Sequence, residues 1–179
     1  MKSGIPVYTA IETQKAIEDS TGERTVAIQP LREYQIGSFT VTPFNVPHES
    51  EIECYGYLIK HKEMGKLLFL TDLEYCKYNF SGLQVEHVMC ECNYSMEFVD
   101  RNEPNYEHRL RGHMSLDTAL KFIFTNDNPA LRNVVLIHLS DKSGNPTLFK
   151  QKVVETLKYD TEVYVAENGL EVDFNLYPF

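Results

Sequence analysis

The apolar residues of this 179-residue chain occur in short runs, and the run that most constrains the fold lies in Asn133–Leu139. Its central part, Val134–Ile137, is apolar without interruption, which is typical of a strand buried on both faces. Such a strand belongs in the interior of a sheet that helices cover. Every apolar run is shorter than the roughly 20 residues that a transmembrane helix needs. The pattern therefore predicts a globular domain and no membrane partner.

The net charge and the cysteine pattern argue against some classes of function. Lys and Arg number 17 against 26 Asp and Glu, so the net charge is −9. An acidic chain does not attract phosphate backbones unless it has a basic patch or bound metal cations, and the only basic cluster is Arg109–Arg111, so unspecific DNA binding is not expected. The N-terminal segment lacks the apolar stretch of a secretory signal. Four cysteines without zinc-finger spacing are then expected to be reduced thiols, and the protein is expected to be cytoplasmic.

Hydrophobic periodicity predicts one α/β domain spanning residues 1–179, with strands dominating the first half and strand–helix alternation the second. Apolar spacing on one face predicts helices, and alternating or continuous apolar residues predict strands. The predicted helices are Thr9–Asp19, Ser115–Thr125 and Leu148–Leu157. The predicted strands are Ile5–Tyr8, several short strands within 26–46, Cys54–His61, Lys66–Thr71, Val85–Cys92, Asn133–Leu139, Thr161–Ala166 and Leu170–Leu176.

Three polar residues stand just beyond or at the end of apolar strands, namely His48, Asp72 and His138. Imidazole and carboxylate groups are the ligands that zinc and related metals prefer, and three protein ligands with an open position describe a catalytic site. These residues lie too far apart in sequence to form a local motif. Each of them, taken alone, fits a hydrogen-bonded residue at a strand end better than it fits a metal ligand.

Six short motifs follow one another along most of the chain: Val46-Pro47-His48-Glu49, Gly56-Tyr57-Leu58-Ile59, Leu70-Thr71-Asp72, Glu91-Cys92-Asn93-Tyr94, Gly112-His113-Met114-Ser115 and Ile137-His138-Leu139-Ser140. In this order they resemble the later part of metallo-β-lactamase-fold hydrolases, in the YycJ-like branch of nucleases and phosphodiesterases. The resemblance implies an incomplete αββα sandwich with a dinuclear metal site at one edge of its sheets. His48 and His138 would then be histidine ligands of divalent zinc or manganese, and Asp72 would bridge both ions.

The same resemblance suggests roles for residues around the metal. His113 could contact a scissile phosphate or protonate a leaving group, whereas the alternative is a histidine hydrogen-bonded to backbone near a helix start. Glu91 and Asn93 could support the metal ligands or simply close a turn at a strand end. The remaining candidates for substrate contact or ligand support are Ser115, Ser140 and Asn145, which also fit ordinary capping and loop chemistry.

The strongest motif of this fold family, His-x-His-x-Asp-His, does not occur in the sequence. The resemblance implies that the chain begins just downstream of it. A metal-dependent hydrolase of phosphodiester bonds is then expected to be impaired, with its metal weakly bound or absent. The alternative is a non-catalytic remnant or assembly domain. An uncovered sheet edge and apolar face would favour a homo-oligomer, while nucleic acid is a partner only through the family resemblance.

Overall fold

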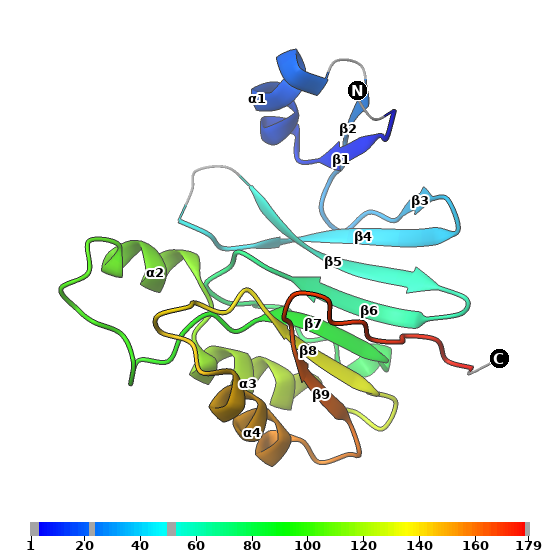
Figure 1. Ribbon diagram of the computed structural model, residues 1–179. Coiled ribbons are helices and arrows are strands. Elements are labelled where there is room, and N and C mark those ends of the chain that lie inside the picture. The colour runs from blue at the N-terminus through cyan, green and yellow to red at the C-terminus, as the bar shows by residue number, and fades with distance from the viewer. Residues whose placement is uncertain (1–3, 22–23, 50–52, 178–179) are drawn as a thin grey trace.

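The computed structural model describes residues 4–21, 24–49 and 53–177 (Figure 1). In order, the elements are β1 (Val7–Thr9), α1 (Ile11–Thr21), β2 (Thr25–Ala27), β3 (Tyr34–Ile36), β4 (Phe39–Val46), β5 (Cys54–His61), β6 (Gly65–Leu70), β7 (His87–Glu91), α2 (Tyr106–Gly112), α3 (Leu116–Asn126), β8 (Asn133–Ile137), α4 (Pro146–Thr156) and β9 (Glu162–Val165). Within this part of the chain they form a mixed α/β fold, as the sequence predicts.

Seven strands form the main sheet in the order β3-β4-β5-β6-β7-β8-β9, and β1 pairs with β2 in a separate parallel ribbon. Neighbouring strands from β3 to β6 are antiparallel, and those from β6 to β9 are parallel. The predicted hairpin of β5 and β6 is confirmed, with His61 opposite Gly65. Gly65 has φ +80°, a left-handed conformation that glycine adopts without steric strain and that lets the chain reverse here.

Helices α3 and α4 cover one face of the parallel half of the sheet (Figure 1). The predicted burial of β8 on both faces is confirmed, because Val134, Val135 and Leu136 are all buried. The predicted start of α3 is also confirmed, since the Ser115 side chain accepts a hydrogen bond from the Thr118 N–H. The core between sheet and helices consists mainly of Leu68, Leu70, Val88, Cys90, Ala119, Ile123, Val134, Leu136, Phe149 and Val153.

The predicted strand Leu170–Leu176 is wrong, because this segment makes no strand ladder within the described structure. Its apolar alternation has another cause. The Phe174 ring stacks on the ring of His87 with centroids 4.5 Å apart, and the Leu176 N–H donates to the Glu63 carbonyl at 2.7 Å. An extended segment that packs one set of side chains on a sheet alternates like a strand without joining it.

The four cysteines are free thiols, as predicted, and Cys90 and Cys92 are buried. Burial raises the pKa of Cys76 to about 11 and that of Cys90 to about 12, which keeps both thiols protonated and unreactive. None of the described helices has the length and apolar character that crossing a membrane would demand.

Candidate metal centre

The carboxyl ends of β6, β7 and β8 meet at one edge of the sheet, because these three neighbouring strands are parallel. Asp72 lies two residues beyond β6, Glu91 ends β7, and His138 directly follows β8. Asp72 and His138 both have left-handed backbone, with φ +54° and +58°. This conformation costs a residue with a Cβ about 1–2 kcal/mol, so the surrounding structure holds two strained turns side by side at this edge.

Asp72, His113 and His138 form a cluster in which each residue offers one ligand atom, and these three atoms lie within 4.8 Å of one another. Asp72 and His138 are partly exposed, while the His113 side chain is only 16% exposed. Two imidazoles and one carboxylate are a donor set that suits zinc and similar divalent cations. The residues present therefore fit a metal ion.

The buried side chain of Glu91 supports this cluster through hydrogen bonds. Its side chain is fully buried, its Oε1 accepts from Nδ1 of His113 at 2.7 Å, and its Oε2 accepts from the Leu73 N–H at 3.1 Å. The same Oε1 lies 3.7 Å from Nδ1 of His138. The hydrogen bond to Glu91 raises the pKa of His113, against the lowering effect of its burial. Because a carboxylate only accepts, Nδ1 of His113 carries the proton and Nε2 is left for a ligand.

The loop after β8 is tied down by hydrogen bonds around His138. The Asn93 amide donates to the His138 carbonyl at 2.7 Å, and the Ser140 N–H donates to the Asn93 carbonyl at 2.9 Å. On the other side, the Thr71 hydroxyl donates to Asp72 at 3.1 Å and lies 3.3 Å from Nδ1 of His138. These contacts hold both strained residues in place, while support of a metal ligand by Asn93 stays a prediction.

His48 lies beside the cluster but outside the three ligand atoms that converge. Its Nδ1 donates to the Gly112 carbonyl at 2.8 Å, and its ring centroid is 5.8 Å from that of His113. A Cβ on Gly112 would meet Cε1 of His48 at 3.0 Å, so the glycine makes room for this ring. Sequence reasoning from the resemblance places His48 among the metal ligands, whereas the converging third ligand atom comes from His113.

One nearby pair was not anticipated. Nδ1 of His108 is hydrogen-bonded to the carboxylate of Glu49, and the His108 ring lies 5.6 Å from that of His113 and 6.2 Å from that of His48. Helix α2, which carries His108, is also missing from the sequence prediction. It is short and lacks a periodic apolar face, so no local signal marks the helix or this pair.

Three other predicted residues serve local structure. Asn145 accepts from the Leu148 N–H at 3.0 Å and caps α4, as Ser115 caps α3. The Ser140 hydroxyl accepts from the Ser143 N–H at 3.2 Å inside the loop that follows His138. All three hydroxyl or amide groups therefore have structural partners, and substrate contact by any of them stays a prediction.

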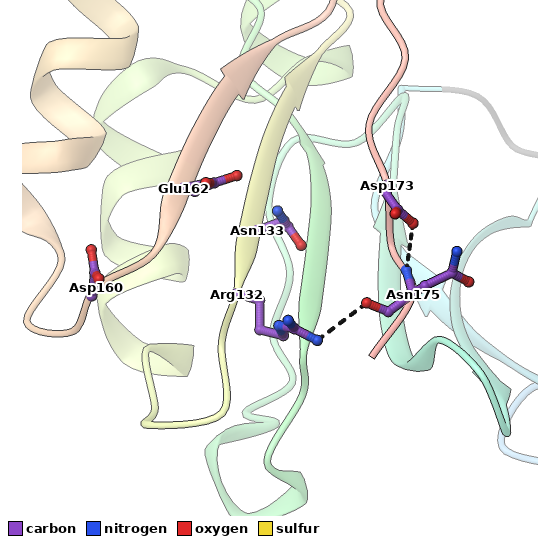
Figure 2. Close-up of a pocket in the computed structure, with 6 residues that line it drawn as sticks. All are labelled: Arg132, Asn133, Asp160, Glu162, Asp173 and Asn175. Carbon is purple, nitrogen blue, oxygen red and sulfur yellow. Dashed lines mark hydrogen bonds between the residues drawn. The ribbon is translucent and has the colours of Figure 1, made fainter. Parts of the chain in front are cut away.

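A polar cavity of about 380 Å³ lies at the opposite edge of the sheet, where β8 and β9 begin (Figure 2). Arg132 closes it toward the C-terminal segment by donating to the carbonyls of Asn175 and Leu176 at 3.2 and 2.9 Å. Its carboxylates do not converge on a metal position as Asp72 does with its two histidines. The residues that line it are Arg132, Asn133, Asp160, Glu162, Asp173 and Asn175. We therefore place the candidate site at the carboxyl edge.

No family model and no curated protein matches this sequence. Solved structures do match. The metallo-β-lactamase fold protein YhfI from Bacillus subtilis is 20% identical with a TM-score of 0.67, over 92% of this chain and 63% of that one. A diphosphatase from the PhnP family is 13% identical with a TM-score of 0.61, over 94% and 57%.

Yeast PDE1 is 15% identical with a TM-score of 0.61, and the match covers 92% of this chain and 58% of that one. The chain thus spans 57–63% of the length of these three proteins. At such low identity the likeness establishes the fold alone. The parallel strands that end together, the helices on one face and these matches lead to one conclusion: the chain has a metallo-β-lactamase-like α/β fold.

Proposed function

We propose that this chain is a metal-dependent hydrolase of the metallo-β-lactamase superfamily that acts on phosphodiester bonds. The observation that carries the proposal is the convergence of ligand atoms from Asp72, His113 and His138 within 4.8 Å at the carboxyl edge of the parallel strands. Ligand sites in open α/β sheets lie at this edge. Two structural neighbours, a diphosphatase and yeast PDE1, support a phosphorus-containing substrate.

In this proposal Asp72, His113 and His138 hold one divalent cation, zinc or manganese. Such an ion supplies Lewis-acid chemistry when bound, by polarising a phosphoryl oxygen. Glu91 holds the proton on Nδ1 of His113 and so presents Nε2. The same Nε2 cannot hold a cation and donate a proton at once, so the leaving-group role suggested for His113 competes with its role as a ligand.

We expect the activity to be low and the ion to be weakly held. Three protein ligand atoms converge on one position, and within the described residues there is no second group of this kind. The family resemblance implies two ions and a histidine motif that this sequence lacks. These two observations also favour the second candidate, a non-catalytic domain that binds one ion or none and acts in assembly.

Metal analysis tests the proposal directly. After treatment with a chelator, the wild-type chain is titrated with Zn²⁺ and Mn²⁺, and bound metal is counted by mass spectrometry. We expect one weakly bound ion per chain, and a loss of at least tenfold in affinity for Asp72→Asn and His138→Ala. His61→Ala is the matched control, because His61 is also a surface histidine with a hydroxyl partner, Ser38, but lies at the far edge of the sheet.

Hydrolysis of bis-(p-nitrophenyl) phosphate by the loaded protein then separates the two candidates. Slow turnover that disappears in Asp72→Asn and persists in His61→Ala supports the hydrolase. Metal binding with no turnover above that of Asp72→Asn supports the non-catalytic domain. A wild-type chain that binds neither ion contradicts the proposed metal site.

A further inference from the structure

Arg109 is a charged side chain buried in α2, outside the ligand cluster. Its side chain is only 7% exposed. Nη2 donates to Oε2 of Glu103 at 2.7 Å, and Nη1 donates to the Ser143 hydroxyl at 2.9 Å. Lys142 approaches the other Glu103 oxygen at 3.2 Å. A buried guanidinium needs such partners, and its planar fork allows two bonds in two fixed directions.

The two ends of this network lead to the two histidines of the cluster. The backbone carbonyl of Arg109 accepts from the His113 N–H at 3.1 Å, so Arg109 belongs to the helix turn that ends at His113. Ser143 belongs to the loop that follows His138, and its N–H donates to the Ser140 hydroxyl at 3.2 Å. The Arg109 side chain thus links the end of α2 to the loop after β8 by a hydrogen bond.

We propose that Arg109 is a positioning residue that fixes the separation of His113 and His138 and thereby sets the affinity of the site for its cation. This inference rests on the proposed function, because it concerns the same metal cluster. Metal ligands must be held to within about 0.5 Å of their working positions. His138 is in a left-handed conformation, with φ +58°, so its loop is free to relax toward a less strained backbone when its ties are cut.

A purely structural role for Arg109 makes a different prediction. Buried ion pairs contribute little to net stability, and removing one partner chiefly destabilises the fold. In that case a variant that remains folded would bind metal as the wild type does. A positioning role instead predicts weaker binding by protein that is still folded.

The test measures Zn²⁺ dissociation constants by competition with a chromophoric chelator, at a temperature where circular dichroism shows each variant folded. We expect Arg109→Met to weaken binding about 10–100-fold, the range typical when a residue that supports metal ligands is removed. The matched control is Arg111→Met, on the same helix, because Arg111 is exposed and its ion pair with Glu107 lies at the surface. It should bind Zn²⁺ within about twofold of the wild type.

Ser143→Ala provides the second variant. It removes the hydrogen bond between Arg109 and the loop after β8 but keeps the Arg109–Glu103 ion pair. It therefore tests the inference even where Arg109→Met fails to fold. We expect weaker Zn²⁺ binding and faster amide exchange at Ser140 and Gly144 in the metal-free protein. Wild-type affinity in folded Arg109→Met, or in Ser143→Ala, overturns the positioning role alone. A wild-type chain that binds no Zn²⁺ overturns the proposed function as well.

Discussion

At the scale of single residues, the site depends on a carboxylate that solvent does not reach. Glu91 is fully buried, and a buried charge is stable only when hydrogen bonds and opposite charge compensate its lost hydration. Its partners are the His113 ring and the Leu73 N–H. Protonation of His113 therefore stabilises the metal-free fold, whereas a cation held by His113 would supply that compensating charge instead.

This coupling predicts that the free energy of unfolding of the metal-free protein depends on pH. The Glu91 hydrogen bond raises the pKa of His113 in the folded state above its unfolded value of about 6.5. The resulting stabilisation is fully present below about pH 6.5 and is lost as pH rises through the raised pKa. Urea unfolding in the presence of a chelator should therefore show this contribution to the free energy of unfolding declining from pH 6 to pH 8.5.

Glu91→Gln is the control for this measurement, since glutamine keeps an accepting oxygen and removes the charge. Burial lowers the pKa of His87, which acts with the opposite sign: its contribution is present above about pH 6.5 and is lost as pH falls. His87 remains in the variant, so its contribution cancels in the difference between wild type and Glu91→Gln. A difference that does not change with pH would contradict the assignment.

Part of this site is visible in the sequence. Asp72 and His138 follow apolar strands, but it is the family resemblance that groups them as ligands and places His113 at the same site. Neither the residue pattern nor the resemblance marks His113 as a ligand or pairs His108 with Glu49. Both features depend on the path of the connection between β7 and α3, which carries the unpredicted helix α2. Irregular connections carry no periodic signal from which side-chain positions can be derived.

At the scale of elements, sequence periodicity identifies most of the sheet and two of the helices that cover it. Burial on both faces marks β8, the turn at Gly65 marks the β5–β6 hairpin, and one-face spacing marks α3. The segment after β9 is wrongly predicted as a strand, because alternating apolar residues indicate which side chains pack and do not indicate whether backbone groups pair. Pairing depends on free partners at a sheet edge, which only the assembled fold decides.

The two helix caps allow a test of capping against substrate contact. Removing the side-chain acceptor in Ser115→Ala or Asn145→Ala should each lower the free energy of unfolding by about 1 kcal/mol. Ser115→Asp and Asn145→Asp keep an acceptor at the same position and should restore most of that stability. Chemical denaturation measures all four variants. Unchanged stability with lost hydrolysis would instead assign the residue to substrate binding.

At the scale of the whole molecule, the two faces of the parallel strands are covered differently. Helices α3 and α4 bury the face that carries Val88 and Cys90. On the opposite face the C-terminal segment packs Phe174 on His87, while Phe69 and Met89 remain only partly buried. Partly exposed apolar side chains on a sheet face favour association with another apolar surface.

We therefore expect the chain to form a dimer through this opposite face. The net charge of −9 opposes association, but salt screens such repulsion beyond about 8 Å at physiological ionic strength. Light scattering at low micromolar concentration should give about twice the monomer mass of 20.7 kDa. Phe69→Lys should shift the protein to monomer, whereas Tyr159→Lys, at an exposed tyrosine between α4 and β9, should not. A monomeric wild type would contradict this expectation.

The left-handed backbone at Asp72 and His138 has a consequence for directed evolution. Glycine at either position relieves about 1–2 kcal/mol of steric strain, which exceeds the roughly 0.5–1 kcal/mol of chain entropy that glycine loses on folding. Asp72→Gly and His138→Gly should thus raise the melting temperature of the metal-free chain while removing a ligand of the proposed cation site. A library selected only for heat resistance should therefore enrich these glycines, and its winners should have lost the proposed cation site.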